Sequence, residues 1–170
     1  MNQFIIVQIS STVKLYPSGA NSGASRSGIA SNLTLNWIRC KSLYESVIPI
    51  RSNLDVISSS EIDGLILSDI GLIEDAVSHG LEAHVSVQEN VTNSHTLKTL
   101  HTLGAKRAIL SRELSIDEIA EITDKSPIET EIFIHGAMCM AISGRCFLSY
   151  GLYGRSANCG DCLQPCRKNW

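Results

Sequence analysis

Residues 64–88 read GLILSDIGLIEDAVSHGLEAHVSVQ, in which two apolar runs flank a helical pattern. The runs, Gly64–Asp69 and Ala83–Gln88, have the length and apolar content of buried strands. Between them, four apolar residues recur at the spacing of one helix face: Leu72, Ile73, Ala76 and Val77. Gly80 can end that helix. The stretch therefore predicts a strand–helix–strand unit, from which parallel sheets are built.

The same unit repeats further along the chain. Arg107–Ser111 and Thr130–His135 are two more strand-like runs. Helical patterns precede them, one through Leu97, Leu100 and His101 before Gly104, the other through Ile116, Ile119, Ala120 and Thr123. Ser115 and Glu118 have the spacing of a capping box, which would fix the start of the second helix. This alternation predicts right-handed crossovers and a parallel sheet.

Two parallel architectures compete, an open doubly wound sheet and a closed β/α barrel. No Gly-x-Gly-x-x-Gly turn follows any of the strand-like runs, so a dinucleotide-binding crevice has no support. Polar residues instead follow the carboxyl ends of the runs: Asp69, Gln88, Arg112 with Glu113, and His135. Barrel enzymes assemble their chemistry on that face. The expected fold is α/β, a partial TIM-like (β/α) barrel with parallel strands and a cysteine-rich C-terminal loop region.

Composition and charge are those of one globular domain. The chain has 170 residues, 44% of them hydrophobic, which is enough to form a buried core without disulfide bonds. A formal charge of −3 gives no general field that attracts nucleic acid or an anionic membrane, so any such contact must be local. The N-terminus lacks the basic and apolar regions of a signal peptide, and no window is long enough for a membrane span. We expect a cytoplasmic protein with no membrane partner.

Residues 1–60 differ from the rest. Ser10–Ser31 is dense in Ser, Gly, Ala and Asn, which predicts loop or poorly ordered chain. Leu33, Trp37, Cys40 and Tyr44 then share one helical stripe, on which Cys40 is expected to be a buried thiol. We therefore divide the chain into a partly disordered segment with one helix, residues 1–60, and a partial barrel, residues 61–170.

The cysteines gather at the other end of the chain. Five of the six lie at positions 139, 146, 159, 162 and 166, among Gly, Arg and Asn. Thiols in a reducing cytosol are more often ligands or catalysts than disulfides. Thiolates select iron–sulfur centres, zinc or copper(I), so the pattern predicts a metal or cluster site within residues 139–166.

The segment EIFIHGAMC runs from Glu131 to Cys139 and is followed by Cys146-Phe-Leu-Ser149. This motif closely resembles the signature of peptidase family U32, the collagenase-like proteases. His84–Ser94, Leu110–Ser115 and Gly154–Arg167 also resemble family segments in order and spacing. The resemblance fades before Glu61. It implies a β/α barrel, and it implies either peptidase activity or a four-iron, four-sulfur cluster that serves hydroxylation of RNA or quinone rings.

The resemblance also implies ligands. The four cysteines that match the cluster pattern are Cys139, Cys146, Cys162 and Cys166. Cys159 stands where the family typically has a basic residue, so it is a neutral replacement, a substitute ligand, or half of a zinc site with Cys162. Zinc is therefore the alternative metal.

A polar pocket at the mouth of the barrel is expected to hold the substrate, an RNA base or a small aromatic molecule. The residues predicted to line it are His84, Gln88, Asn90, Arg112 and His135. Arg155 lies with Arg145, Arg167 and Lys168 around the cysteines, where guanidinium groups suit phosphate or carboxylate. No catalytic residue is assigned, because there is no Gly-x-Ser-x-Gly elbow and no His-Glu-x-x-His helix.

Three functions stay open at this point. The first is an iron–sulfur protein for hydroxylation, the second a metal-dependent collagenase-like peptidase, and the third a non-enzymatic scaffold stabilised by zinc or a cluster. Eight strands close a barrel, and this sequence predicts four clear ones. We expect a truncated or remodelled family member whose open sheet edges need a homo- or hetero-oligomeric partner.

Overall fold

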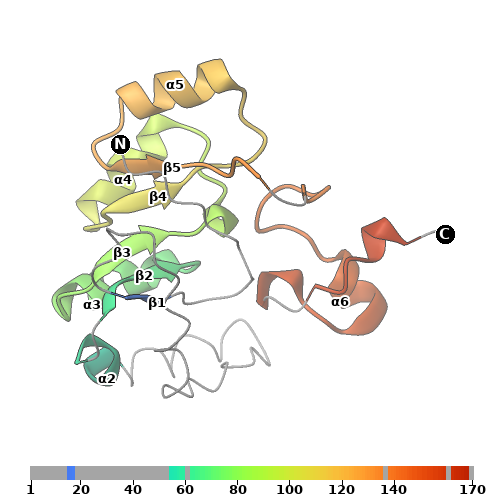
Figure 1. Ribbon diagram of the computed structural model, residues 1–170, viewed down its shortest axis with the longest axis horizontal. Coiled ribbons are helices and arrows are strands. Elements are labelled where there is room, and N and C mark those ends of the chain that lie inside the picture. Colours follow the sequence, from blue (N-terminus) through green and yellow to red (C-terminus); the bar gives the residue numbers. More distant parts are fainter. Residues whose placement is uncertain (1–14, 18–53, 60–61, 136–137, 160–161, 169–170) are drawn as a thin grey trace.

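The computed structural model describes residues 15–17, 54–59, 62–135, 138–159 and 162–168 (Figure 1). The helix predicted through Trp37 and Cys40 lies outside these residues. Among the described residues, no helix is both long and apolar enough to cross a membrane.

A five-stranded sheet forms the centre, with its strands side by side in chain order. They are β1 (Leu15–Pro17), β2 (Ile62–Leu67), β3 (Glu82–Val85), β4 (Arg107–Ile109) and β5 (Glu129–Glu131). β2 to β5 are parallel, which confirms the predicted parallel sheet. β1 pairs antiparallel with β2. The composition of the stretch around β1 predicted a loop, but the open edge of β2 offers hydrogen-bond partners to an extended segment.

Helices connect the strands as predicted. The α-helices are α2 (Leu54–Ser58), α3 (Ile73–Ser78), α4 (Ser94–Thr102), α5 (Ile116–Asp124) and α6 (Leu148–Tyr153). Short 3₁₀ turns lie at Ile70–Leu72, Val87–Glu89, Ala157–Cys159 and Pro165–Arg167. The capping box is present, since Ser115 Oγ accepts from the Glu118 N–H and the Glu118 carboxylate accepts from the Ser115 N–H at 2.7 Å.

One face of the sheet packs against the helices. The main core cluster joins strand residues such as Leu65, Val85 and Ala108 to Ile73 of α3 and Leu97 of α4. Two details differ from the helical patterns in the sequence. Val77 is 42% exposed, and α5 buries Ile122 while Ile116 is 84% exposed. A pattern of apolar positions marks a helix, but the orientation of α5 is set by contacts with the sheet.

The opposite face is partly polar. Only Ile66, Val87 and Ile109 form a small buried apolar cluster there, with Phe133 packed against it. The strands lie in chain order and the core cluster places the described helices on one face, whereas a doubly wound sheet carries helices on both faces. The described strands form an open sheet with β1 and β5 at its edges, so the expected barrel is not closed by them.

Candidate functional site

The loops after β3 and β4 carry most of the predicted site residues. Ser86 caps the short turn Val87–Glu89, and Asn90 follows it in the left-handed region with φ 51°. The Asn90 Oδ1 atom is buried and has no hydrogen-bond partner among the described residues. Arg112 and Glu113 follow β4 in the same way. These loops lie at the carboxyl ends of neighbouring parallel strands, as predicted.

The segment that we call the cysteine loop, residues 138–147, is fastened to the end of β4. The Arg112 guanidinium donates to Ser143 Oγ from Nε at 3.2 Å and from Nη2 at 3.0 Å, and to the carbonyl oxygen of Ala141 at 3.5 Å. Glu113 Oε1 accepts from the Ser143 N–H at 3.2 Å, and its other oxygen accepts from the Ser111 hydroxyl. Ser143 is 1% exposed. Arg112 therefore positions the loop.

The same loop contacts the end of β3. Gly144 has φ +72°, and a Cβ placed on it would lie 1.9 Å from the carbonyl oxygen of Gln88. The Gln88 side chain donates from Nε2 to the carbonyl oxygen of Asn158 at 3.3 Å. Gln88 thus touches both the cysteine loop and the turn that contains Cys159.

Two hydrogen bonds bring the C-terminal cysteine segment, residues 162–168, beside the cysteine loop and α6. Arg167 Nη2 donates to the carbonyl oxygen of Met138 at 2.9 Å, so the neighbour of Cys166 contacts the neighbour of Cys139. The N–H of Leu163 donates to Ser149 Oγ at 3.0 Å, and Ser149 is fully buried. The two halves of the cysteine pattern are therefore adjacent. Figure 1 shows α6 and this segment to one side of the sheet.

The four predicted ligands are free thiols. Cys139, Cys162 and Cys166 are exposed and Cys146 is half-buried. Cys162 Sγ accepts from the Gln164 N–H at 3.3 Å. The donor chemistry fits a soft metal or cluster, and the segments are adjacent. Within the described ranges, however, no three His, Cys, Asp or Glu side chains are grouped closely enough to hold a metal ion. The side chain of Cys159 lies outside those ranges.

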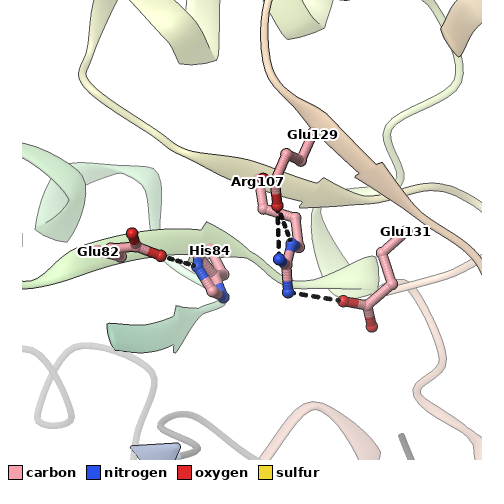
Figure 2. A network of polar contacts seen from close by, with 5 residues as sticks. All are labelled: Glu82, His84, Arg107, Glu129 and Glu131. Atoms are coloured by element: carbon pink, nitrogen blue, oxygen red, sulfur yellow. Dashed lines mark hydrogen bonds and ion pairs between the residues drawn. The ribbon is translucent and has the colours of Figure 1, made fainter. Parts of the chain in front are cut away.

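His84 belongs to a polar network on the face of the sheet away from the helices (Figure 2). Its Nε2 is 3.1 Å from Glu82 Oε2 on the same strand. Arg107 on β4 lies between two carboxylates of β5, with Nε 2.9 Å from Glu129 Oε2 and Nη1 3.6 Å from Glu131 Oε2. Burial lowers the pKa of His84, and Arg107 adds to this, whereas Glu82 and Glu129 oppose it. His84 is therefore neutral at physiological pH.

Two carboxylates at the strand ends were not among the residues predicted to line the pocket, although Glu113 was named with the polar residues that follow the strands. Burial raises the pKa of Glu89, the nearby charge of Asp69 raises it further, and Arg145 of the cysteine loop opposes both. Burial would also raise the pKa of Glu113, but the hydrogen bonds from Ser111 and Ser143 and the charge of Arg112 hold it below its usual value. Glu89 follows the predicted residue Gln88 directly, so its position in the sequence was a usable signal.

The remaining predicted residues are less enclosed. His135 is exposed beyond the end of β5, and Arg155 is exposed in the turn after α6. The structure thus brings Gln88 and Arg112 against the cysteine loop, keeps Asn90 in the turn that follows Gln88, and places His84 on the strand itself.

Comparison with known sequences assigns the chain to a family. The family model described as peptidase family U32 matches residues 22–170. The chain belongs to peptidase family U32. The U32 match begins at residue 22 and so extends upstream of Glu61, although the resemblance of the individual motifs fades before Glu61.

Three U32 relatives show the range of functions. An uncharacterized protease of Methanocaldococcus jannaschii is 56% identical over 75% of this chain and 33% of its own length. The tRNA hydroxylation protein P of Haemophilus influenzae is 52% identical over 62% of this chain and 24% of its own. The 23S rRNA 5-hydroxycytidine C2501 synthase of Escherichia coli is 36% identical over 85% of this chain and 21% of its own length. The chain thus spans a third or less of these relatives. No solved structure matches it.

Proposed function

We propose that this chain serves the hydroxylation of an RNA base, as part of an iron–sulfur protein. The observation that carries the proposal is the 52% identity to a tRNA hydroxylation protein. The rRNA 5-hydroxycytidine synthase supports the same substrate class. A small aromatic acceptor is the alternative substrate, because Gln88, Asn90 and Arg112 offer amide and guanidinium groups suited to either ring.

In this proposal Cys139, Cys146, Cys162 and Cys166 hold a four-iron, four-sulfur cluster. A cluster of this kind supplies electron transfer when it is bound. The chain itself supplies the scaffold. Arg112 and Glu113 hold the cysteine loop through Ser143, and Arg167 ties the second cysteine pair to Met138. Because the sulfur atoms are not gathered among the described residues, cluster binding would draw these tied segments closer.

Anaerobic reconstitution with iron and sulfide tests the cluster. We expect iron, acid-labile sulfide and the visible absorption of a cluster in the purified chain, and loss of all three in Cys139→Ser and Cys162→Ser. Cys159→Ser is the matched control, since it removes a neighbouring thiol outside the proposed ligand set. A protein that stays free of iron, or that binds zinc and loses it in Cys159→Ser, would overturn the cluster and favour the zinc scaffold.

Analysis of nucleosides tests the reaction. RNA incubated with the reconstituted chain and a two-electron oxidant that donates an oxygen atom should have a C–H bond of a base converted to C–OH, as measured by mass spectrometry of its nucleosides. A Cys139→Ser protein should leave the RNA unchanged. If the reconstituted chain carries its cluster and still leaves both tRNA and rRNA unmodified, RNA hydroxylation by this chain is wrong.

The name of the archaeal relative supports a second candidate, a peptidase. Gelatin or casein degradation that persists in Cys139→Ser and Cys146→Ser would favour it, because a peptidase does not need those cysteines.

We also propose that the parallel sheet is part of a barrel wall. The chain order of β2 to β5 and the helices on one face support this. Further strands, from this chain or from a partner copy, would then cover the outer edge of β5. Sedimentation of the purified chain at several concentrations tests for a partner copy.

A further inference from the structure

Three aromatic side chains are exposed around α6. Phe147 is 65% exposed, Tyr150 is 57% exposed and Tyr153 is 41% exposed. They follow one another at intervals of three residues, and residues three apart are neighbours on a helix surface. Tyr150 and Tyr153 are therefore neighbours on α6, and Phe147 at its N-cap completes the group of three rings that we call the ridge. Large rings exposed together in this way are a feature that monomeric proteins rarely carry without a binding role.

The ridge lies in a basic part of the chain. Residues 138–168 contain four cations, Arg145, Arg155, Arg167 and Lys168, and a single acid, Asp161, which gives this segment a net charge of +3. The whole chain has a net charge of −3, so the rest of it carries −6. The field around α6 is therefore opposite in sign to that of the sheet and its helices.

A cation and a ring of this surface are in contact. Lys168 Nζ lies 4.9 Å from the centroid of the Tyr153 ring and 3.5 Å from its hydroxyl oxygen. Arg145 is exposed next to Cys146. Cations thus flank the rings in the sequence and one of them contacts a ring, and rings for bases beside cations for phosphates are the parts of single-stranded nucleic-acid sites.

We propose that the face formed by Phe147, Tyr150, Tyr153, Arg145, Arg155 and Lys168 binds single-stranded RNA. The proposal rests on the proposed function for its substrate class and adds where the strand binds. The net charge of +3 on residues 138–168 complements the phosphates of RNA, which favours RNA as the occupant of this face. Ser149 of α6 binds the N–H of Leu163, next to Cys162, so the bound strand runs beside the cysteines.

Fluorescence anisotropy with a short labelled oligouridylate tests the face. Stacking on an aromatic side chain contributes about 1–3 kcal/mol per base, so Tyr150→Ala should weaken binding roughly five- to a hundredfold. Tyr150→Phe keeps the ring and should bind like the native chain. Ile116→Ala is the matched control, because Ile116 is an exposed apolar residue on α5. A duplex of the same length should bind more weakly, since its bases are already stacked.

Lys168→Gln gives a second measurement, which reports on phosphate contacts. Loss of one phosphate contact should reduce the slope of log affinity against log salt by about 0.7. Lys125→Gln is the control, because Lys125 is paired with Glu121 on α5. Equal affinity of Tyr150→Ala and the native chain would overturn the proposal, as would an effect of Tyr150→Ala on self-association alone, which would assign the face to a second copy.

The outcomes separate this proposal from the proposed function. RNA binding that depends on Tyr150 in a chain without cluster or hydroxylation would leave the face in place and remove the reaction. Hydroxylation that is unaffected by Tyr150→Ala would support the reaction and overturn the RNA-binding face.

Discussion

Gly144 lies directly against the backbone of Gln88, and a Cβ on residue 144 would meet the Gln88 carbonyl oxygen at 1.9 Å. The contact joins the cysteine loop to the end of β3, while Arg112 and Glu113 join the same loop to the end of β4. The first cysteine pair is therefore carried by a loop that the sheet positions from two neighbouring strands. Precise ligand placement depends on such support.

Gly144→Ala should release the cysteine loop. The substitution adds a steric clash with Gln88 to the strain of a side chain at φ +72°. We expect faster hydrogen exchange in residues 138–147 and a free energy of unfolding lower by about 2–4 kcal/mol.

Gly154→Ala is the control for Gly144→Ala, because Gly154 has φ +66° and no atom lies within 4 Å of its Cβ position. It should cost only about 1–2 kcal/mol from backbone strain and leave exchange in the loop unchanged. If both variants lose the same stability and the loop stays protected, the contact with Gln88 does not hold the loop.

Arg112→Lys should loosen the loop with little effect on global stability. Lysine carries a point charge and cannot reproduce the forked contact of Nε and Nη2 with Ser143. Tryptic cleavage after Arg145 should become faster, while the free energy of unfolding measured in urea changes by less than about 1 kcal/mol. Lys98→Ala, on the exposed side of α4, controls for the change of a cation. Unchanged cleavage would mean that Arg112 does not hold the loop, and its predicted role would then be contact with the substrate.

His84 should make stability depend on pH. Its folded pKa is below 6.5 because of burial and Arg107, so the unfolded chain binds more protons between the folded pKa and 6.5. Stability is then complete above pH 6.5 and is lost as the pH falls toward the folded pKa. Urea unfolding should show this loss in the native chain and not in His84→Gln. His101→Gln, on the surface of α4, should keep the dependence.

Glu89→Gln should stabilise the chain at neutral pH. Because the folded pKa of Glu89 is raised, mainly by burial and then by Asp69, its ionised form opposes folding above pH 4.5. The gain should stay below about 1 kcal/mol, since water screens a half-exposed group, and should vanish in acid. Glu74→Gln on α3 is the control. A loss of stability at pH 7 would mean that the attraction between Glu89 and Arg145 outweighs burial.

Local patterns in the sequence were sufficient for the elements and the family. Several features depend only on neighbours within a few residues, so they can be recognised from the sequence alone. They are the capping box at Ser115, the turn glycines Gly80 and Gly104, and the apolar runs of β2 to β4. The cysteine spacing and the motif before Cys139 indicated the U32 family for the same reason.

The amino-acid sequence by itself determined the parallel α/β units and the set of thiols, because both depend on residue type and short spacing. Only the tertiary structure decided that α5 buries Ile122, that β1 pairs antiparallel with β2, and that Arg112 holds Ser143, which lies 31 residues away. These contacts join residues from different elements, and their energies exist only after the sheet has placed those elements side by side.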